Sequence, residues 1–466
     1  MKNMKSNKLG TMPMNRLVLN LSLPMMISML IQSLYNVVDS MFVAQISEEA
    51  LAALSLAYPI QMLMIAIQVG AGVGMNAEMS RRLGEDNREM ASETANNGVF
   101  LGIVHYIIFL VLGLTLVRPF FEAQTDNPEI IQYGIEYTVI ITTFSIGKFM
   151  QFVYERSLQA TGRTFYTMIT QGTGAILNIA LDPILIFGLF GVPALGVYGA
   201  AIATVAAQLI SALMAFYFNA KFNDDIDMKY KGFRPNLKVI KRIYAIGVPS
   251  MIMTSITSVV TLLLNNILLQ FTPTATAVYG VYIKLQGFAF MPVFGLNNGM
   301  IPIVSYNYGA RNKKRMTSAI KICLIYAMSM MLMGTILFQA FPEQLLALFN
   351  ASDEMTAIGV SALRTISISF VLAGFSIIIG TVFQALGNGM LSLWVNVIRQ
   401  LVVLVPVAYV LSLSGDVHAV WWSIVISEGV AAVFSVIVMR YVYNKKIRPM
   451  SDNEPLNSER FANEQV

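Results

Sequence analysis

Charged residues are scarce in this sequence: Asp, Glu, Lys and Arg make up 12% of its 466 residues, whereas 56% are hydrophobic. Soluble domains carry about 25% charged residues, so the shortage excludes a chain whose surface faces mainly water. Apolar runs longer than about 18 residues recur from one end of the chain to the other, as is typical of membrane-spanning helices. The sequence therefore predicts a polytopic membrane protein.

Cysteine and histidine are almost absent, with one and two residues respectively. The single cysteine, Cys323, cannot form an intrachain disulfide or supply a four-cysteine zinc site. His105 and His418 are too few and too far apart for a metal centre, and we expect them to pack or to face solvent. The sequence also lacks a phosphate-binding P-loop, so it does not predict ATP hydrolysis as an energy source.

The apolar runs form twelve spans when hydropathy is averaged over about 19 residues. The runs are continuous and rich in Leu, Met and Ala, and they lack the alternation of barrel strands, so we predict an all-α polytopic membrane protein. The spans lie near residues 16–45, 51–79, 93–118, 130–156, 165–189, 196–219, 239–270, 275–305, 316–340, 355–384, 390–412 and 418–443.

The basic residues favour one orientation, because Lys and Arg collect in short cytoplasmic loops. With both termini inside, 26 of the 31 Lys and Arg residues fall in cytoplasmic segments, and only Arg118 falls in an outer loop. This distribution explains the net charge of +5 without nucleic-acid binding. We predict a multi-pass protein of the cytoplasmic (plasma) membrane with both termini in the cytoplasm. The predicted outer loops carry Glu48, Glu49, Glu122, Asp126, Glu129, Glu343, Asp353, Glu354 and Asp416.

An internal repeat relates the two halves of the chain at a constant offset of 225 residues. It continues through Gln159-Ala160 and Gly162, which match Gln384-Ala385 and Gly387. Earlier matching pairs are Pro24 and Pro249, Gly70 and Gly295, Gly74 and Gly299, Ser80 and Ser305, Gly84 and Gly309, and Asn87 and Asn312.

The repeat predicts the domain organisation. Each half holds six spans, so the repeats are parallel and related by an axis along the membrane normal. We predict an N-terminal six-helix bundle at 10–220, a cytoplasmic linker at 221–242, a C-terminal six-helix bundle at 243–445 and a cytoplasmic tail at 446–466. Substrate sites of such folds lie between the repeats, so two rocking bundles around a central cleft predict alternating access.

Two aspartates, Asp39 and Asp182, lie well inside apolar spans, where an aspartate costs about 2.5–3.5 kcal/mol on insertion scales. Asn178 lies four residues before Asp182, so the two share one helix face and can offer an amide oxygen and a carboxylate to one ion. Pro183 also leaves the carbonyl of Ile179 without its helical partner. Such oxygens suit a hard cation such as sodium, or a polar network that a proton reorganises. The alternative is that these side chains only join helices by hydrogen bonds.

Six segments of the chain form a recognisable set: Tyr35-Asn36-Val37-Val38-Asp39, Phe42-Val43, Gly70 to Gly74, Leu158 to Arg163, Asn178 to Pro183, and Gly199 to Thr204. With these segments, nearly the whole chain resembles the multidrug and toxic compound extrusion (MATE) family, in its DinF-like or MepA-like branch. The seventh span, 244–271, carries no acid, unlike that span in the NorM-like branch, so a cation site of that kind in the second half is not expected.

The resemblance implies a secondary antiporter, not an enzyme, that exports diverse, often cationic amphipathic drugs or metabolites in exchange for protons or sodium ions. It adds Asn36 and Thr204 to Asp39, Asn178 and Asp182 as one polar cluster in the first bundle. The expected cofactor is the coupling ion alone, with sodium as the one candidate metal at Asp39, Asn178 and Asp182. The expected partners are small-molecule drugs or organic cations and membrane lipids, with the protein as a monomer.

A substrate cavity is predicted from methionines, aromatic residues and charges within the spans, because thioethers and aromatic faces suit bulky cations. Lys284, Arg364, Arg399 and Glu428 could line a cavity in the second half, but a structural ion pair between Glu428 and one of these cations is favoured over a cavity role. The candidates are Tyr35, Met62, Met291, Lys284, Arg399 and Glu428.

Two other functional classes are alternatives to a drug exporter. An intramembrane aspartyl protease also needs two embedded aspartates, but its motifs differ from the residues before Asp39 and Asp182. A flippase for lipid-linked saccharides, from the same transporter superfamily, remains the alternative. It would use the basic residues within spans, Lys148, Lys284, Arg364 and Arg399, to hold pyrophosphate.

Overall fold

The computed structural model describes residues 7–228 and 232–450, and every regular element in these ranges is helical. Long helices follow each other with short turns in the first half of the chain. Its elements are α1 (Lys8–Thr11), α2 (Met14–Ala44), α3 (Glu48–Gly84), α4 (Arg88–Glu122), α5 (Pro128–Thr143), α6 (Ile146–Ala160), α7 (Thr164–Phe187), η1 (Leu189–Gly191) and α8 (Gly196–Phe222).

The second half follows the same pattern of long helices, with a π-helical stretch, η2, in its fifth predicted span. Its elements are α9 (Leu237–Leu269), α10 (Pro273–Gly309), α11 (Lys313–Ala340), α12 (Pro342–Ala347), α13 (Asp353–Ser367), α14 (Phe370–Ala385), α15 (Gly389–Val397), η2 (Ile398–Leu404), α16 (Val405–Ser412), α17 (Val417–Val420), α18 (Trp422–Val442) and η3 (Tyr443–Ile447).

The helices confirm an all-α polytopic membrane protein, with a difference in the number of spans. Among the described residues, ten helices are long and apolar enough to cross a membrane, and α13 with α14, bent by 49°, makes an eleventh. The predicted span at 130–156 instead forms α5 and α6, which are only 16 and 15 residues long and break at Phe144 and Ser145. This segment carries Glu136, Lys148, Glu155 and Arg156, which lower its hydropathy.

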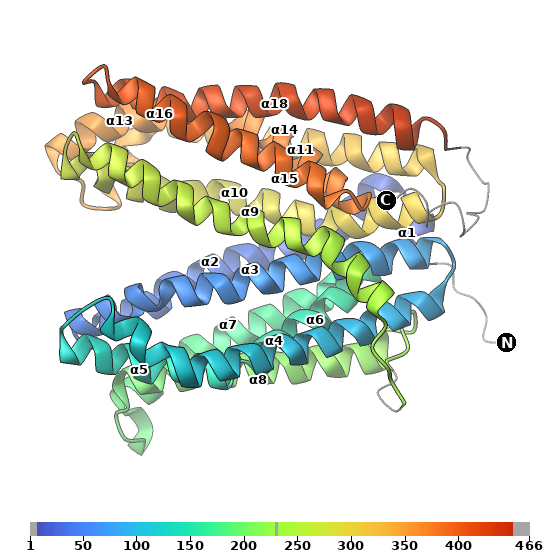
Figure 1. Cartoon of the computed structure of the whole chain (residues 1–466), viewed down its shortest axis with the longest axis horizontal. Coiled ribbons are helices and arrows are strands. Elements are labelled where there is room, and N and C mark those ends of the chain that lie inside the picture. The colour runs from blue at the N-terminus through green and yellow to red at the C-terminus, as the bar shows by residue number, and fades with distance from the viewer. Residues whose placement is uncertain (1–6, 229–231, 451–466) are drawn as a thin grey trace.

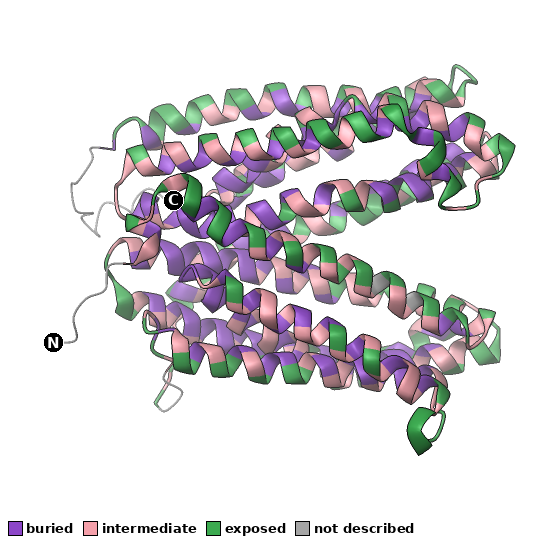
Figure 2. Ribbon diagram, turned by 180° about the vertical axis from the view of Figure 1, so that it is seen from behind, coloured by how far each residue is buried: buried purple, intermediate pink, exposed green. Residues whose placement is uncertain are grey.

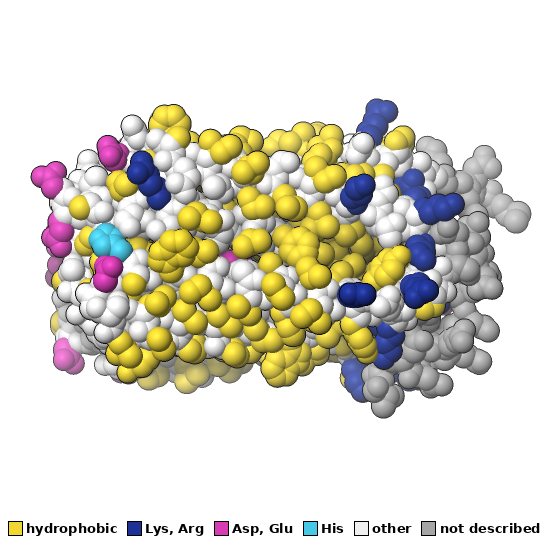
Figure 3. Space-filling view, turned by 90° about the horizontal axis from the view of Figure 1, so that it is seen from above, with side chains coloured by type: hydrophobic (Ala, Val, Ile, Leu, Met, Phe, Trp, Pro, Cys, Tyr) yellow, Lys and Arg dark blue, Asp and Glu magenta, His cyan; other side chains and the backbone are white. Residues whose placement is uncertain are grey.

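The helices lie in two layers along the long axis of the molecule, with α2 to α8 in one layer and α9 to α18 in the other (Figure 1). Both described ends of the chain lie at the same end of this axis. Seen from the side of the second half, Lys and Arg gather toward that end and Asp and Glu at the opposite one (Figure 3). We call these the basic end and the acidic end.

Each half contains one turn at the basic end built in the same way. Asn87 accepts a hydrogen bond from the backbone N–H of Met90 at 2.9 Å and so caps α4, and Asn312 caps α11 through Arg315 N–H at 3.1 Å. The residue before each cap is left-handed, with φ of 57° at Asp86 and 54° at Arg311. The offset of 225 in the sequence is therefore also present in the backbone geometry.

A second contact also occurs once in each half. The Ser80 hydroxyl donates to the Ala160 carbonyl at 3.0 Å, and the Ser305 hydroxyl donates to the Ala385 carbonyl at 2.9 Å. All four residues are buried. These bonds join the second predicted span of each half to the end of its fourth.

Glycines let the two halves approach closely toward the basic end. A Cβ added to Gly84 would overlap the Tyr306 carbonyl oxygen, and one added to Gly309 would overlap that of Arg81. These two contacts are equivalent at the offset of 225, so the halves meet around an approximate two-fold axis. Only glycine fits such a close approach of two helix backbones.

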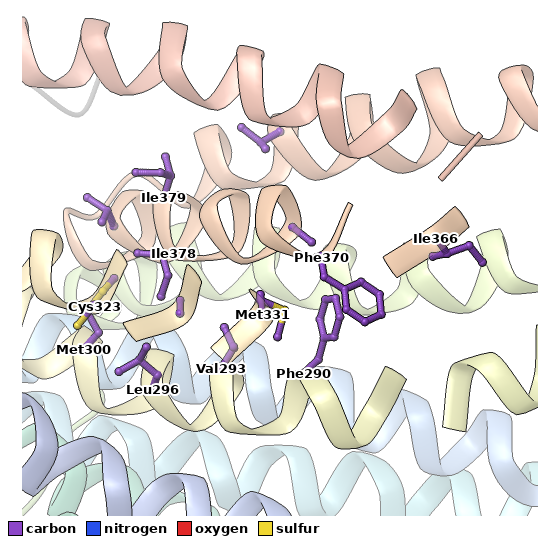
Figure 4. Close-up of a cluster of buried hydrophobic side chains, with 14 of the residues drawn as sticks. Phe290, Val293, Leu296, Met300, Cys323, Met331, Ile366, Phe370, Ile378 and Ile379 are labelled. Atoms are coloured by element: carbon purple, nitrogen blue, oxygen red, sulfur yellow. The ribbon is translucent and has the colours of Figure 1, made fainter. Parts of the chain in front are cut away.

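The apolar core is largest in the second half, where α10, α11, α13 and α14 pack together (Figure 4). The rings of Phe290 and Phe370 meet edge to face with centroids 5.2 Å apart, and Cys323 is fully buried beside Met300. Exposed residues follow the outer helices (Figure 2), and many of them are large and apolar, such as Leu114, Leu262 and Val433. This surface is what a lipid-facing protein requires.

Candidate ion-coupling site

Three polar side chains meet between α7 and α8 in the first half. Asn178, Asp182 and Thr204 are buried, with exposed fractions of 2%, 0% and 7%. In the amide orientation that satisfies both neighbours, Asn178 donates to Asp182 Oδ2 at 3.0 Å and accepts from the Thr204 backbone N–H at 3.1 Å. The i, i+4 spacing on α7 therefore brings Asn178 to Asp182 on one helix face, and the packing of α8 brings Thr204 to the same amide.

Asp39 of α2 completes this group from the opposite side. Its carboxyl lies within hydrogen-bonding reach of the Asp182 carboxyl, and its Oδ1 atom is buried without a hydrogen-bond partner. Two ionised carboxylates repel each other and cannot donate a hydrogen bond, so a proton or a cation between them would stabilise this contact. The side chain of Asn36 lies outside the described residues.

Three further side chains extend the cluster, and two of them were missed in the sequence. Tyr35 was predicted as a cavity residue, but its hydroxyl lies at Thr204 and near both aspartates. Tyr137 of α5 lies near the same aspartates and near the side chain of Gln61 of α3. The sequence positions of Tyr137 and Gln61 do not indicate that they belong to the cluster, because only the tertiary structure brings their helices to Asp39.

The prolines act on the backbone of the same helices. Pro24 lies inside α2 and Pro183 inside α7, directly after Asp182. The Asn20 carbonyl, which Pro24 leaves without its helical partner, accepts a hydrogen bond from the Thr164 hydroxyl at 3.4 Å. This bond joins α2 to the start of α7, so the two helices that carry the aspartates are also joined at the basic end.

Comparison with known proteins shows the family of the chain. The MatE family matches residues 24–184 and again residues 249–410. The chain belongs to the MatE family. It is therefore a membrane transporter and not an enzyme, as the sequence predicted, and the two matched segments begin 225 residues apart.

Individual MatE relatives are distant in sequence but cover almost the whole chain. The multidrug export protein MepA of Staphylococcus haemolyticus (strain JCSC1435) is 26% identical over 429 residues, covering 92% of this chain and 94% of that protein. MepA of Staphylococcus aureus (strain MRSA252) is 25% identical over 428 residues, again covering 92% of this chain and 94% of that protein.

Solved structures of the family show the same fold. The structure described as an outward-facing conformation of a multidrug resistance MATE family transporter has a TM-score of 0.90 and 27% identity, covering 96% of this chain and 100% of that one. A transporter of Pyrococcus furiosus, described as having a binding pocket of reversed polarity that suggests a different function, has a TM-score of 0.86 and 28% identity, with the same coverage.

The charged residues predicted for a cavity in the second half of this MatE chain do not form one group. Arg399 Nη1 lies 3.3 Å from Glu428 Oε1 and forms an ion pair between η2 and α18, with Tyr282 beside it. Lys284 instead lies over the Phe349 ring, 5.9 Å from its centroid. Met62 and Met291 are partly buried on α3 and α10.

The two halves therefore differ chemically. The cluster around Asp182 has two acids and no basic partner among the groups in contact with it, whereas Arg399 and Glu428 neutralise each other. Carboxylate, amide and hydroxyl oxygens fit a sodium ion, and the unpartnered Asp39 Oδ1 is available to such an ion or to a proton. In the first half, the residues that would hold the ion are Asp39, Asn178 and Asp182.

Proposed function

We propose that this MatE protein is a secondary active antiporter that exports structurally diverse, often cationic amphipathic drugs or metabolites in exchange for protons or sodium ions. The observation that carries the proposal is the group of Asp39, Asn178 and Asp182, in which Asn178, Asp182 and the neighbouring Thr204 are buried and Asp39 is partly buried. Asn36 stays a predicted member of this group. Two embedded acids without a basic partner are costly unless they take up and release a cation. Uptake and release of an ion is what coupling to a gradient requires.

The proposed cycle alternates access between two bundles, 10–220 and 243–445, joined by 221–242 and followed by the tail 446–466. Contacts between the halves gather toward the basic end. Arg156 Nη1 donates to Asn298 Oδ1 at 2.9 Å, and Gly84 and Gly309 make the close approaches described above. The likeness to an outward-facing relative supports the same state here, with the basic end closed.

The short helix α1 reinforces this closure. Its buried Leu9 offers a backbone carbonyl to Asn307 Nδ2 at 3.2 Å and to Arg315 Nη2 at 3.1 Å, both in the second half. On the other side, Lys8 Nζ donates to Asn20 Oδ1 of α2 at 2.8 Å. These bonds must break before the halves separate at the basic end, so they bias the equilibrium toward the state described here.

The proposed substrates follow the MepA relatives, whose name denotes multidrug export. Tyr35, Met62 and Met291 are proposed to line the path of a bulky cation, because aromatic and thioether groups adapt to varied shapes. The paired Arg399 and the separate Lys284 do not gather as a pyrophosphate site would require, so the lipid-linked saccharide flippase is disfavoured.

The proposed location is the cytoplasmic (plasma) membrane, with a monomer as the transporting unit and both termini in the cytoplasm. The basic end would then face the cytoplasm, in keeping with the positive-inside rule. Under this orientation, the acidic end opens to the outside when the basic end is closed.

The test is transport in proteoliposomes with proton and sodium gradients imposed separately. Drug accumulation should follow at least one gradient and should not need ATP. Accumulation that requires ATP and ignores both gradients would refute secondary transport. If the purified protein binds a lipid pyrophosphate and does not bind lipophilic cations, the flippase is favoured instead.

A further inference from the structure

The loop between α7 and α8 is a protruding apolar segment at the acidic end. It covers residues 188–196, Gly-Leu-Phe-Gly-Val-Pro-Ala-Leu-Gly, and contains no charged or hydroxyl side chain. Phe190 is 91% exposed and Leu189 is 44% exposed. The loop extends from one corner of the molecule as an exposed protrusion (Figures 1 and 2).

The loop differs from the other segments at that end. Acids lie in or beside four of the other five connections that the sequence places outside, at Glu48, Glu122, Asp353 and Asp416. The fifth, the short turn between α9 and α10, has no acid but carries the polar residues Gln270 and Thr272. In contrast, no Asp, Glu, Lys, Arg or His occurs between Asp182 and Lys221. A loop that projected into water would have no reason to exclude charge so completely.

The internal repeat provides a direct comparison. At the offset of 225, the loop corresponds to residues 413–421, which include Ser414, Asp416 and His418. There, Asp416 accepts a hydrogen bond from the His418 N–H at 2.8 Å, as in a solvated turn. The same backbone position is thus polar in the second half and apolar in the first.

The backbone holds the apolar side chains outward. Phe190 has φ of 59°, a left-handed conformation that an aromatic residue adopts at a cost of order 1–3 kcal/mol, between Gly188 and Gly191 with φ of 75° and 84°. The Leu195 N–H donates to the Leu185 carbonyl at 2.9 Å and closes the base of the loop. Phe190 is therefore presented by a defined turn.

The surface next to the loop is apolar, which indicates that lipid lies against this side of the molecule. Exposed apolar side chains continue from the loop along α7 and α8, with Phe187 at 37%, Leu209 at 45% and Leu213 at 61%. Tyr198, near the start of α8, is 45% exposed, and tyrosine favours the membrane–water interface. A helix face of this composition in a membrane transporter lies against acyl chains.

We propose that residues 188–196 form a membrane anchor, which inserts Leu189 and Phe190 into the lipid leaflet at the acidic end, beside the first half. The occupant is the interfacial region of that leaflet, where aromatic and aliphatic side chains partition favourably. The anchor directly continues α7, six residues after Asp182, so it fixes the end of the helix that carries the coupling acid. The proposal does not depend on which ion or drug is transported.

Site-directed spin labelling tests the anchor. Phe190→Cys is labelled with a nitroxide in liposomes of phosphatidylcholine and phosphatidylglycerol, and its collisions with oxygen and with a water-soluble nickel chelate are compared. The natural Cys323 is fully buried, so the unaltered chain serves as the labelling blank. Ser414→Cys, which is equivalent to Leu189 and exposed, is the water reference, and Leu213→Cys on α8 is the lipid reference.

The anchor predicts that the label at position 190 collides more with oxygen than with the nickel chelate, as at Leu213, whereas position 414 shows the reverse. Equal behaviour at 190 and 414 would overturn the proposal, because the loop would then be in water. Shielding from both reagents would also overturn it, since a protein surface would then cover the loop. The collision measurement reports where the loop lies whether or not the labelled protein transports drug. A failure of the proposed transport function would therefore not change the result for the anchor.

Discussion

The first and second halves share a backbone plan but place different chemistry within it. Asp39 and Asp182 correspond, at the offset of 225, to Leu264 and Val407. The second half instead has Arg399 paired with Glu428 at 3.3 Å. A neutral pair needs no external ion, whereas two neighbouring acids do. The two halves therefore share their fold and contact each other through equivalent residues. Ion coupling, in contrast, is proposed for the first half alone.

The largest effect is expected from removing either acid of the first half. Asp39→Asn and Asp182→Asn should each strongly reduce gradient-driven drug transport in proteoliposomes, because one carboxyl alone no longer forms the shared ion site. The double variant should lose little more than the worse single variant, since residues that act as a unit are non-additive. Additive losses would show two independent sites.

A large effect on stability, with transport kept, is expected at the charge pair of the second half. Arg399→Leu should destabilise the protein by about 3 kcal/mol, because it leaves the carboxyl of Glu428, whose side chain is only 13% exposed, without its partner. Adding Glu428→Leu should restore most of the loss, since a buried pair is often replaced by apolar side chains without cost. Thermal unfolding in detergent measures both. A double variant that is stable but uncoupled would place ion coupling in the second half as well.

A smaller effect is expected where the two halves meet. Gly84→Ala should cost about 1–3 kcal/mol, since the new methyl group overlaps the Tyr306 carbonyl and shifts the helices apart. Gly287→Ala is the matched control, because no other atom lies near a Cβ at that helical position. Cross-linking between cysteines placed on the two halves at the basic end should become less efficient for Gly84→Ala and stay unchanged for Gly287→Ala. An unchanged contact would show that the halves do not need this approach.

The smallest effect is expected at the acidic end. Glu122→Gln removes an exposed partner of Arg118, whose Nη1 lies 3.4 Å away, and such surface pairs contribute about 0–1 kcal/mol. Its transport and unfolding temperature should match the unaltered protein. A marked loss of coupling in this variant would show that an exposed acid at the acidic end matters as much as Asp39 and Asp182 do.

Much of the fold was predictable because its signals are local or periodic. Apolar runs located the helices, and the repeat matched Asn87 with Asn312, whose role as helix caps came only from the structure. The break at Phe144 and Ser145 was missed, because a hydropathy average spreads across a two-residue interruption. The i, i+4 spacing gave Asn178 with Asp182. Tyr137 was missed because its place beside Asp39 depends on how α5 packs, which no sequence spacing encodes.

The most direct test of the account separates ion coupling from drug binding in the same vesicles. Drug counterflow needs only binding and alternating access, whereas accumulation against a drug gradient also needs the coupling ion. Asp182→Asn should retain counterflow and lose accumulation under both proton and sodium gradients. If Asp182→Asn accumulates drug like the unaltered protein, with the same dependence on pH and sodium, the cluster around Asp182 only joins helices and the account is wrong.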